Sequence, residues 1–372
     1  MLRTIAFGAG VTALLACPAF AHHPSGASST SAAGPIATIS ATTLEKGQGV
    51  VGIVLEAVNI DPFSDAQLIN FAGNHVHAHS LDAILAPSLV IAYGLTNDLT
   101  ISARLPVVVR QNVREGSHHH PGEGAPAENS VVELGDSSGI GDLTLLGQYR
   151  FFNNRAAQLE MAALVGVKLP TGRTNVINNE GERFEAEFQP GSGSVDGLLG
   201  LALTKRVGAW SFDTSVLYQL TGTGTQDTDL GDRLLYNAAV SYRILGGPAG
   251  PSAGSGGGSG GRMHAGLPEP MYHGGPKGRD HHHDHHPEPV AARGPALDLV
   301  LELNGEWHDR QRIGGVTDPN SGGNVIYLSP GVRLSMDKWS GFVSVGVPVV
   351  NDMNGVQAEP DWRLLAGVSV GF

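Results

Sequence analysis

Apolar and polar residues alternate with a period of two along most of the chain, and the pattern is clearest at its end. There, every second position from Trp362 to Val370 is apolar. The positions between them are Arg363, Leu365, Gly367 and Ser369, which apart from the leucine are small or charged. Successive side chains of a β-strand point to opposite faces. The segment is therefore predicted to be a strand with one apolar face and one more polar face.

The same alternation predicts about twelve strands. They cover roughly 47–60, 83–95, 97–110, 141–153, 157–169, 194–207, 209–221, 232–246, 296–308, 323–336, 339–351 and 361–372. Short turns alternate with long connections at roughly 61–82, 111–140, 170–193, 222–231, 309–322 and 352–360. An even number of antiparallel strands, with tight turns at one end and long loops at the other, is typical of a bacterial outer-membrane barrel.

A soluble β-sandwich would also alternate, but two observations favour the barrel. Single charges recur on the polar faces and suit a water-filled lumen, which we expect to be lined by Arg104, Arg150, Glu160, Lys168, Arg243, Glu302, Arg333 and Arg363. Aromatic residues gather near strand ends on the apolar face, as in interfacial girdles. The predicted fold class is an all-β, transmembrane antiparallel β-barrel of about 12 strands with long outer loops.

Composition agrees with a chain of strands and turns. Charged residues make up 16% of the chain, glycine occurs 52 times, and the formal net charge is -12. A nucleic-acid partner needs a basic surface, so no nucleic-acid binding is expected. After the N-terminus the sequence has no apolar run long enough for a membrane-spanning helix.

The first residues have the pattern of a secretory signal peptide. A positive start at Arg3 and an apolar stretch over 5–16 precede a small-x-small site, which predicts cleavage after Ala21. Cleavage at a lipoprotein site before Cys17 is the alternative. We expect residues 1–21 to be the signal peptide, 22–46 an N-terminal extension, and 47–372 a barrel in the bacterial outer membrane.

One connection departs from the alternation of short turns and long loops. Residues 247–295 are rich in Gly, Pro, Ser and His and poor in apolar side chains. Such a composition cannot bury a core, so the segment is predicted to be a disordered insert. The strand count places this insert on the periplasmic side.

Three segments are similar to signatures of a known family. "YGLTNDLTISARLPVV", "SGIGDLTLLGQYRFF" and "VGVKLPTG" resemble outer-membrane barrels of the MetA pathway of phenol degradation family. The resemblance implies a transporter that moves small, often aromatic or hydrophobic, compounds across the outer membrane. The final Phe372 resembles the C-terminal signal by which the barrel insertion machinery recognises such proteins.

The 16 histidines are concentrated in predicted loops and in the insert. Clustered imidazoles, with Asp, can bind divalent metals such as Zn, Cu or Ni. The candidate ligands are His75, His77, His79, His118, His119, His120, His281, His282, His283, Asp284, His285 and His286. In an extended segment, His75, His77 and His79 would have their rings on one side. The alternative to metal binding is that these runs are low-complexity loops without a dedicated role.

The expected function is a channel for passive passage of small solutes, without a required cofactor and with outer-membrane lipid around it. Two alternatives stay open: a metal-linked barrel whose histidine loops serve uptake, efflux or gating, and a structural barrel that conducts nothing. An enzyme is not expected. A Ser-His-Asn lipase on such a barrel needs an outward-facing histidine, whereas the position of His308 in its strand points inward.

Overall fold

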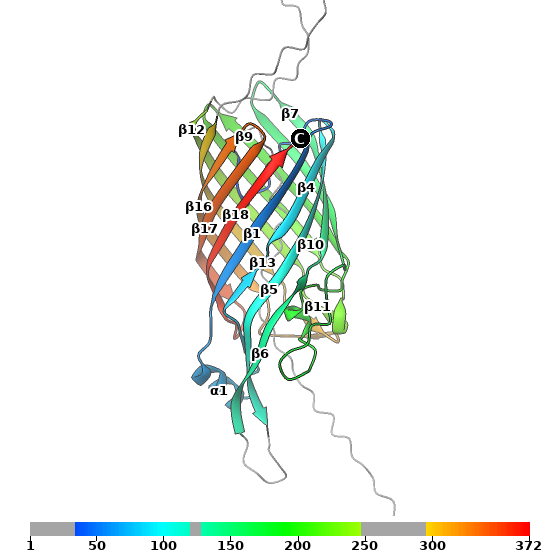
Figure 1. Cartoon of the computed structure of the whole chain (residues 1–372), viewed down its shortest axis with the longest axis vertical. Helices are drawn as coiled ribbons and strands as arrows, with labels where there is room; N and C mark the ends of the chain where they lie inside the picture. The colour runs from blue at the N-terminus through cyan, green and yellow to red at the C-terminus, as the bar shows by residue number, and fades with distance from the viewer. Residues whose placement is uncertain (1–33, 120–127, 247–294) are drawn as a thin grey trace, which may run out of the picture.

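The computed structural model describes residues 34–119, 128–246 and 295–372 and shows a closed antiparallel barrel of 12 strands (Figure 1). The wall consists of β1 (Gly49–Asp61), β4 (Ser88–Thr96), β5 (Leu99–His119), β7 (Leu143–Asn154), β8 (Leu159–Leu169), β9 (Asp196–Val207), β10 (Trp210–Leu220), β12 (Arg233–Leu245), β13 (Ala296–His308), β16 (Gly323–Met336), β17 (Trp339–Met353) and β18 (Glu359–Gly371). Both the fold class and the predicted strand number are confirmed.

The barrel closes where its first strand meets its last. β1 pairs with β18 from Val50 opposite Gly371 to Asp61 opposite Glu359. Gly49 and Phe372 also exchange two backbone hydrogen bonds of 2.9 Å. Every backbone group of a membrane-spanning strand needs a partner, and closure removes the two unpaired edges that an open sheet would leave in lipid.

The distribution of side chains is inverted relative to a soluble protein. Large apolar residues such as Leu199, Leu201 and Leu301 are half exposed or more on the outside, while charged residues of the same strands are buried inside. The aromatic residues near strand ends on the apolar face are all exposed, as predicted for a girdle: Tyr93, Tyr149, Phe151, Trp210, Tyr242, Trp307, Trp339 and Trp362. An apolar outer belt with aromatic borders is the surface that lipid requires. No helix among the described residues has the length and apolarity to cross a membrane.

The two ends of the barrel differ. We call the end with Phe372 and the short turns, such as those at Asn97 and Gly208, the turn end, and the opposite end the loop end (Figure 1). β12 ends and β13 begins at the turn end, so residues 247–294, which lie outside the described residues, connect two strands on that side. In outer-membrane barrels the short turns are periplasmic. The insert thus attaches on the side that the strand count predicted.

The loop end carries the remaining elements. They are α1 (Asp65–Gly73), the short strands β2 (His79–Ser80) and β3 (Ala83–Leu85), β6 (Glu128–Ile140), two single-turn 3-10 helices (Ala186–Phe188 and Thr225–Asp227), and a small sheet of β11 (Thr228–Asp229), β14 (Arg312–Ile313) and β15 (Val316–Thr317).

The predicted loop at 111–140 is largely a hairpin instead. β5 continues to His119 and pairs with β6, from Val107 opposite Ile140 to His119 opposite Glu128. The hairpin projects beyond the barrel wall (Figure 1). Its outer part stands in water on both faces and needs no apolar stripe, so the alternation that predicted the other strands is missing there.

Candidate functional site

Residues 34–46, which we call the N-terminal strap, run through the lumen and leave it at the turn end, where Lys46 is exposed. Ile36, Ala37 and Ala41 are almost completely buried although they belong to no strand. The Glu302 carboxylate in the middle of β13 accepts hydrogen bonds from the backbone N–H groups of Ile36, Ala37 and Thr38 at 2.9–3.1 Å. The described part of the predicted N-terminal extension is thus an internal plug.

Side chains of other strands hold the rest of the N-terminal strap. Hydroxyl groups of Ser215, Thr204 and Thr100 accept hydrogen bonds from its backbone N–H groups at 2.8–3.2 Å. Gln148 donates from Nε2 to two of its carbonyl oxygens, both at 2.9 Å. The strap therefore crosses the lumen from β13 and β10 to β5 on wall side chains, without joining the sheet.

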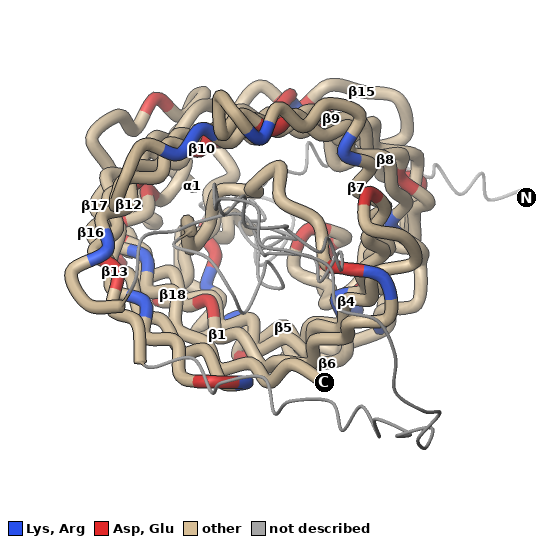
Figure 2. Tube along the Cα trace, turned by 90° about the horizontal axis from the view of Figure 1, so that it is seen from above, with Lys and Arg blue, Asp and Glu red and all other residues tan. Residues whose placement is uncertain are grey.

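The eight charged residues predicted to line the lumen all lie on the inside of the wall, where Figure 2 shows charges around the closed ring. Five form ion pairs at 2.5–3.3 Å: Arg104 with Glu56, Arg150 with Asp98 and Glu160, Lys168 with Asp196, and Arg243 with Asp298. Glu302 and Arg333 bind the N-terminal strap, the latter through the Pro35 carbonyl. Arg363 donates to Asn304 at 2.8 Å and lies over the Tyr327 ring.

These contacts correct the expectation of a water-filled lumen. Seven of the eight residues are less than a tenth exposed. Their partners include Glu56, Asp196 and Asp298, which face inward by the same alternation but were not among the predicted residues. Opposite charges placed on adjacent strands within a closed wall pair with one another, because isolated charges there would lose their hydration.

The loop between β8 and β9, residues 170–193, folds into the loop end of the lumen, and we call it the plug loop. Phe184 and Phe188 are each 1% exposed and belong to an apolar cluster with wall residues such as Val108 and Val58. The Arg110 guanidinium donates to the carbonyl oxygens of Phe188 and Gln189 at 3.4 and 3.1 Å. The lumen is therefore occupied from both ends by segments of the chain itself.

Histidines and carboxylates meet where the plug loop touches the outer loops. His79 Nε2 lies 3.1 Å from Glu115 Oε2 and 3.8 Å from Glu185 Oε2, while its Nδ1 lies 3.9 Å from Glu187 Oε1. His77 Nε2 lies 3.9 Å from Glu115 Oε2. We call these five residues the His-Glu cluster. It joins three segments: the start of β2 with the residues just before it, the projecting part of β5, and the plug loop.

Burial and mutual charge shape the protonation of the His-Glu cluster. Burial disfavours the charged form of His79, but Glu185, Glu115 and Glu187 outweigh it and raise the pKa of His79 to about 9. Burial raises the pKa of Glu185, and burial together with the charge of Glu185 raises the pKa of Glu187 well above its usual range. Burial and the neighbouring His79 lower the pKa of His77. A protonated His79 thus offsets part of the negative charge.

The other predicted metal ligands are placed differently. His75 has a positive φ of 56° just after α1, and its ring packs against His118 with centroids 4.7 Å apart. The backbone is therefore not extended through His75, and the expectation that its ring would lie beside those of His77 and His79 is wrong. His118 and His119 are strand residues at the tip of β5 rather than loop residues. His120 and the run from His281 to His286 lie outside the described residues.

Three residues of the His-Glu cluster were not predicted. Glu115 precedes the His118 run in what the sequence suggested was a loop, and Glu185 and Glu187 stand two residues apart between two phenylalanines. The spacing of Glu185 and Glu187 on an extended chain is a weak signal that they could act together. Nothing in the sequence links them to His79, which lies over a hundred positions earlier.

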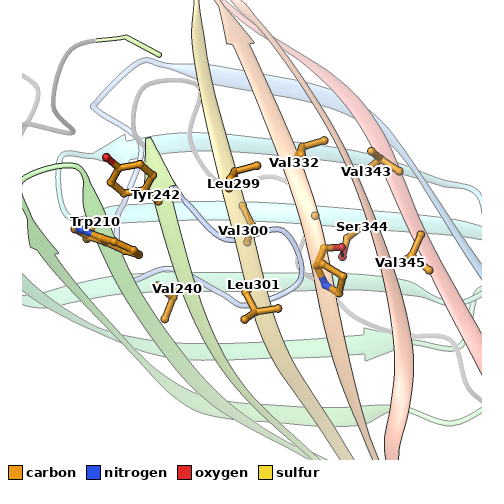
Figure 3. A pocket seen from close by; sticks show the side chains of 12 residues that line it. Trp210, Val240, Tyr242, Leu299, Val300, Leu301, Val332, Val343, Ser344 and Val345 are labelled. Carbon is orange, nitrogen blue, oxygen red and sulfur yellow. Dashed lines mark hydrogen bonds between the residues drawn. The ribbon is translucent and has the colours of Figure 1, made fainter. Parts of the chain in front are cut away.

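An apolar groove of about 830 Å³ lies on the lipid-facing side of the wall (Figure 3). It crosses β10, β12, β13, β16 and β17 between Trp210 and Val345, with Val300, Gly331 and Ser344 on its floor. Behind this floor, Ile36 of the N-terminal strap occupies the space that a side chain at residue 331 would fill. Its apolar lining fits the lipid belt, and its position makes it a feature of the membrane-facing surface.

We compared the chain with protein families and with known sequences and structures. The model of the family described as putative MetA-pathway of phenol degradation matches residues 96–262. Among curated protein sequences none matches this chain.

Solved structures give distant matches to the barrel. The COG4313 outer membrane channel from Pseudomonas putida F1 is 15% identical, with a TM-score of 0.47, over 89% of this chain and 97% of that chain. The β domain of the Bordetella autotransporter BrkA is 10% identical, with a TM-score of 0.39, over 88% and 100%. The TodX monoaromatic hydrocarbon channel, in a mutant form, is 11% identical, with a TM-score of 0.39, over 88% and 91%.

The family match begins three residues into the first segment quoted from the sequence, contains the other two, covers β5 to β12 and continues into residues that the structure does not describe. The expected resemblance is confirmed: the chain is a β-barrel of outer-membrane type that resembles the putative MetA-pathway of phenol degradation family.

Proposed function

We propose that the protein is a gated outer-membrane channel for passive passage of small hydrophobic or aromatic solutes. The observation that carries the proposal is that the lumen is closed by two segments outside the barrel sheet, the N-terminal strap and the plug loop. Side chains of the wall hold the N-terminal strap. Side-chain contacts and the backbone hydrogen bonds of Arg173 and Asn179 to β6 hold the plug loop, so both can leave without breaking the ladder of the twelve wall strands. Release of both segments opens a path between the two ends.

The preference for apolar solutes follows from what lines the loop end. Phe184 and Phe188 pack among aliphatic wall residues, and Phe63 lies against the same cluster. A solute that enters as the plug loop moves outward meets aromatic and aliphatic surface first, which favours flat apolar molecules. Deeper in the lumen, cations and carboxylates are paired, so strong ion selectivity is not expected.

Influx into liposomes containing the refolded protein tests this function. Neutral aromatics cross lipid unaided, so benzoate is the aromatic probe and gluconate the hydrophilic probe of equal charge. We expect faster influx of benzoate than of gluconate through the unaltered protein. Removal of residues 22–44 should raise both rates at least about tenfold, because the segment whose N–H groups donate to Glu302, Ser215 and Thr204 is then absent and passage needs release of the plug loop alone.

The plug loop provides the matched control. Phe188→Ala should raise gluconate influx and bring the benzoate-to-gluconate ratio toward one, whereas Phe151→Ala, on the lipid face and 52% exposed, should leave the ratio unchanged. If neither probe enters liposomes that contain the variant with Phe188→Ala and without residues 22–44, the proposed channel function is contradicted. It would favour the structural barrel that conducts nothing.

A further inference from the structure

We propose that the His-Glu cluster is a divalent transition-metal site, of the kind that Zn²⁺ occupies, and that the metal fastens the plug loop inside the lumen. The ligands are His77 just before β2, His79 at the start of β2, Glu115 from β5, and Glu185 from the plug loop, taken from two triads that share His79. The site itself stands on geometry alone. Its gating role rests on the proposed channel function.

The distances suit a small tetrahedral cation. Zn²⁺ binds nitrogen and oxygen ligands at about 2.0–2.1 Å, which places ligand atoms of a tetrahedron about 3.3 Å apart. Around His79 Nε2, the separations to Glu115 Oε2 and Glu185 Oε2 are 3.1 and 3.8 Å, and His77 Nε2 is 3.9 Å from Glu115 Oε2. Movements of well under an ångström bring these three pairs to the required spacing. Glu185 must in addition move toward His77 and Glu115, because it shares only His79 with their group of atoms within 4.8 Å. Two imidazoles with carboxylates are a ligand set that zinc accepts.

The surroundings of the ligands also indicate a cation. Glu185 Oε2 is buried and accepts no hydrogen bond among the described residues. The ion pairs of Glu115 and Glu185 within that part of the chain are with histidine alone. A buried carboxylate oxygen without a donor is costly, and metal coordination would satisfy it.

Glu187 has the position of a supporting residue. His79 Nδ1 faces Glu187 Oε1 at 3.9 Å, on the side of the ring away from Nε2, and Gln311 Nε2 donates to Glu187 Oε2 at 3.1 Å. Metal-binding histidines commonly donate their second N–H to a carboxylate, which fixes the tautomer and the ring orientation. His79 also stacks edge-on against Phe188 with centroids 4.9 Å apart, so the site adjoins the apolar plug directly.

The consequence for the channel comes from which segments the ligands belong to. His77, His79 and Glu115 lie on parts attached to β5, whereas Glu185 lies on the plug loop, which has to leave the lumen for solutes to pass. One metal ion would therefore cross-link the movable segment to the fixed one. Its loss would leave the plug loop held by the apolar contacts of Phe184 and Phe188, by the hydrogen bonds from Arg110 and by backbone hydrogen bonds to β6.

Zinc binding to the full chain tests the site. The protein is refolded, stripped with a chelator and titrated with Zn²⁺ against a chromophoric competitor, in a background where the histidines of 118–120 and 281–286 are replaced by asparagine. We expect one tight site, weakened at least about tenfold by Glu185→Gln and by Glu115→Gln. Glu182→Gln, an exposed carboxylate of the same loop, should have no effect. Heat-modifiable migration in gels confirms that each variant is folded.

Single-channel recording separates the site from the function. Micromolar Zn²⁺ added on the loop side should lower the open probability of the parent and not that of Glu185→Gln. Equal zinc affinity in Glu185→Gln and Glu182→Gln would overturn the site, whatever the conductance does. Tight binding that Glu185→Gln abolishes, in a barrel that conducts under no condition, would keep the site and overturn the proposed channel.

Discussion

The contact between Glu302 and the N-terminal strap gives the sharpest test of the closed lumen. Three backbone N–H groups, from Ile36, Ala37 and Thr38, donate to its carboxylate. A hydrogen bond to a charged acceptor contributes about 1.5–3 kcal/mol, and one to a neutral acceptor about 0.5–1.5 kcal/mol. Glu302→Gln removes the charge at nearly constant shape, so it should weaken strap docking by about 2–3 kcal/mol.

That change in free energy corresponds to an increase of about 30–150-fold in the population with a released strap. The rate at which a charged maleimide labels Ser40→Cys measures this population, because residue 40 is 4% exposed when the strap is docked. A chain refolded from residue 22 has no other cysteine, since the one cysteine of the sequence is at position 17. Labelling should accelerate by the same factor in the Glu302→Gln background.

Asp298→Asn is the matched control. Asp298 lies in the same strand and is equally buried, but its carboxylate pairs with Arg243 at 2.8 Å within the wall and makes no hydrogen bond to the strap among the described residues. Labelling that is unchanged in Glu302→Gln, or accelerated equally in Asp298→Asn, would refute the assignment of Glu302 as the anchor of the strap.

Three further outcomes are expected. Lys168→Met should destabilise the barrel by about 3–5 kcal/mol in urea unfolding, because it leaves the buried Asp196 without its 2.5 Å partner; the exposed Lys338→Met should change the unfolding free energy little. Replacing 247–294 by a short turn should preserve heat-modifiable migration, since β12 and β13 pair along their whole lengths without it; loss of that migration would contradict the strand map. Removing Phe372 should reduce assembly in cells far more than refolding in detergent, and equal losses in both would argue against its role as an insertion signal.

The wall of the barrel could be predicted because the inward or outward direction of each side chain depends only on its position within its own strand. Arg150 and Glu160 alternate with outward apolar neighbours in their own strands, so the sequence alone places each on the inner face, and the turns between strands limit their register. Whether such charges meet water or one another depends on the opposite strand and on what fills the barrel. The sequence therefore suggested a wet lumen where the structure has ion pairs.

The two plugs could not be predicted for the same reason. The strap sequence around Ile36 has no strand or helix period, and it is held by a carboxylate 266 positions away. Ile36 fits because residue 331 is a glycine, a complementarity that appears only once both are in one lumen. Glu185 and His79 are equally remote from each other. Local patterns predict elements, whereas contacts between unpatterned segments need the closed wall that brings them together.

The seam between β1 and β18 constrains the order in which this molecule can be made. The pairing of β1 with β18, which closes the barrel, extends to residue 371. A chain that stops within β18 therefore leaves part of β1 as an unpaired edge. The strap precedes β1, yet it contacts strands as late as β16. It must either be enclosed while the wall curls around it or thread in afterwards from an open end. Biogenesis of this protein therefore includes an internal docking step in addition to insertion into the membrane.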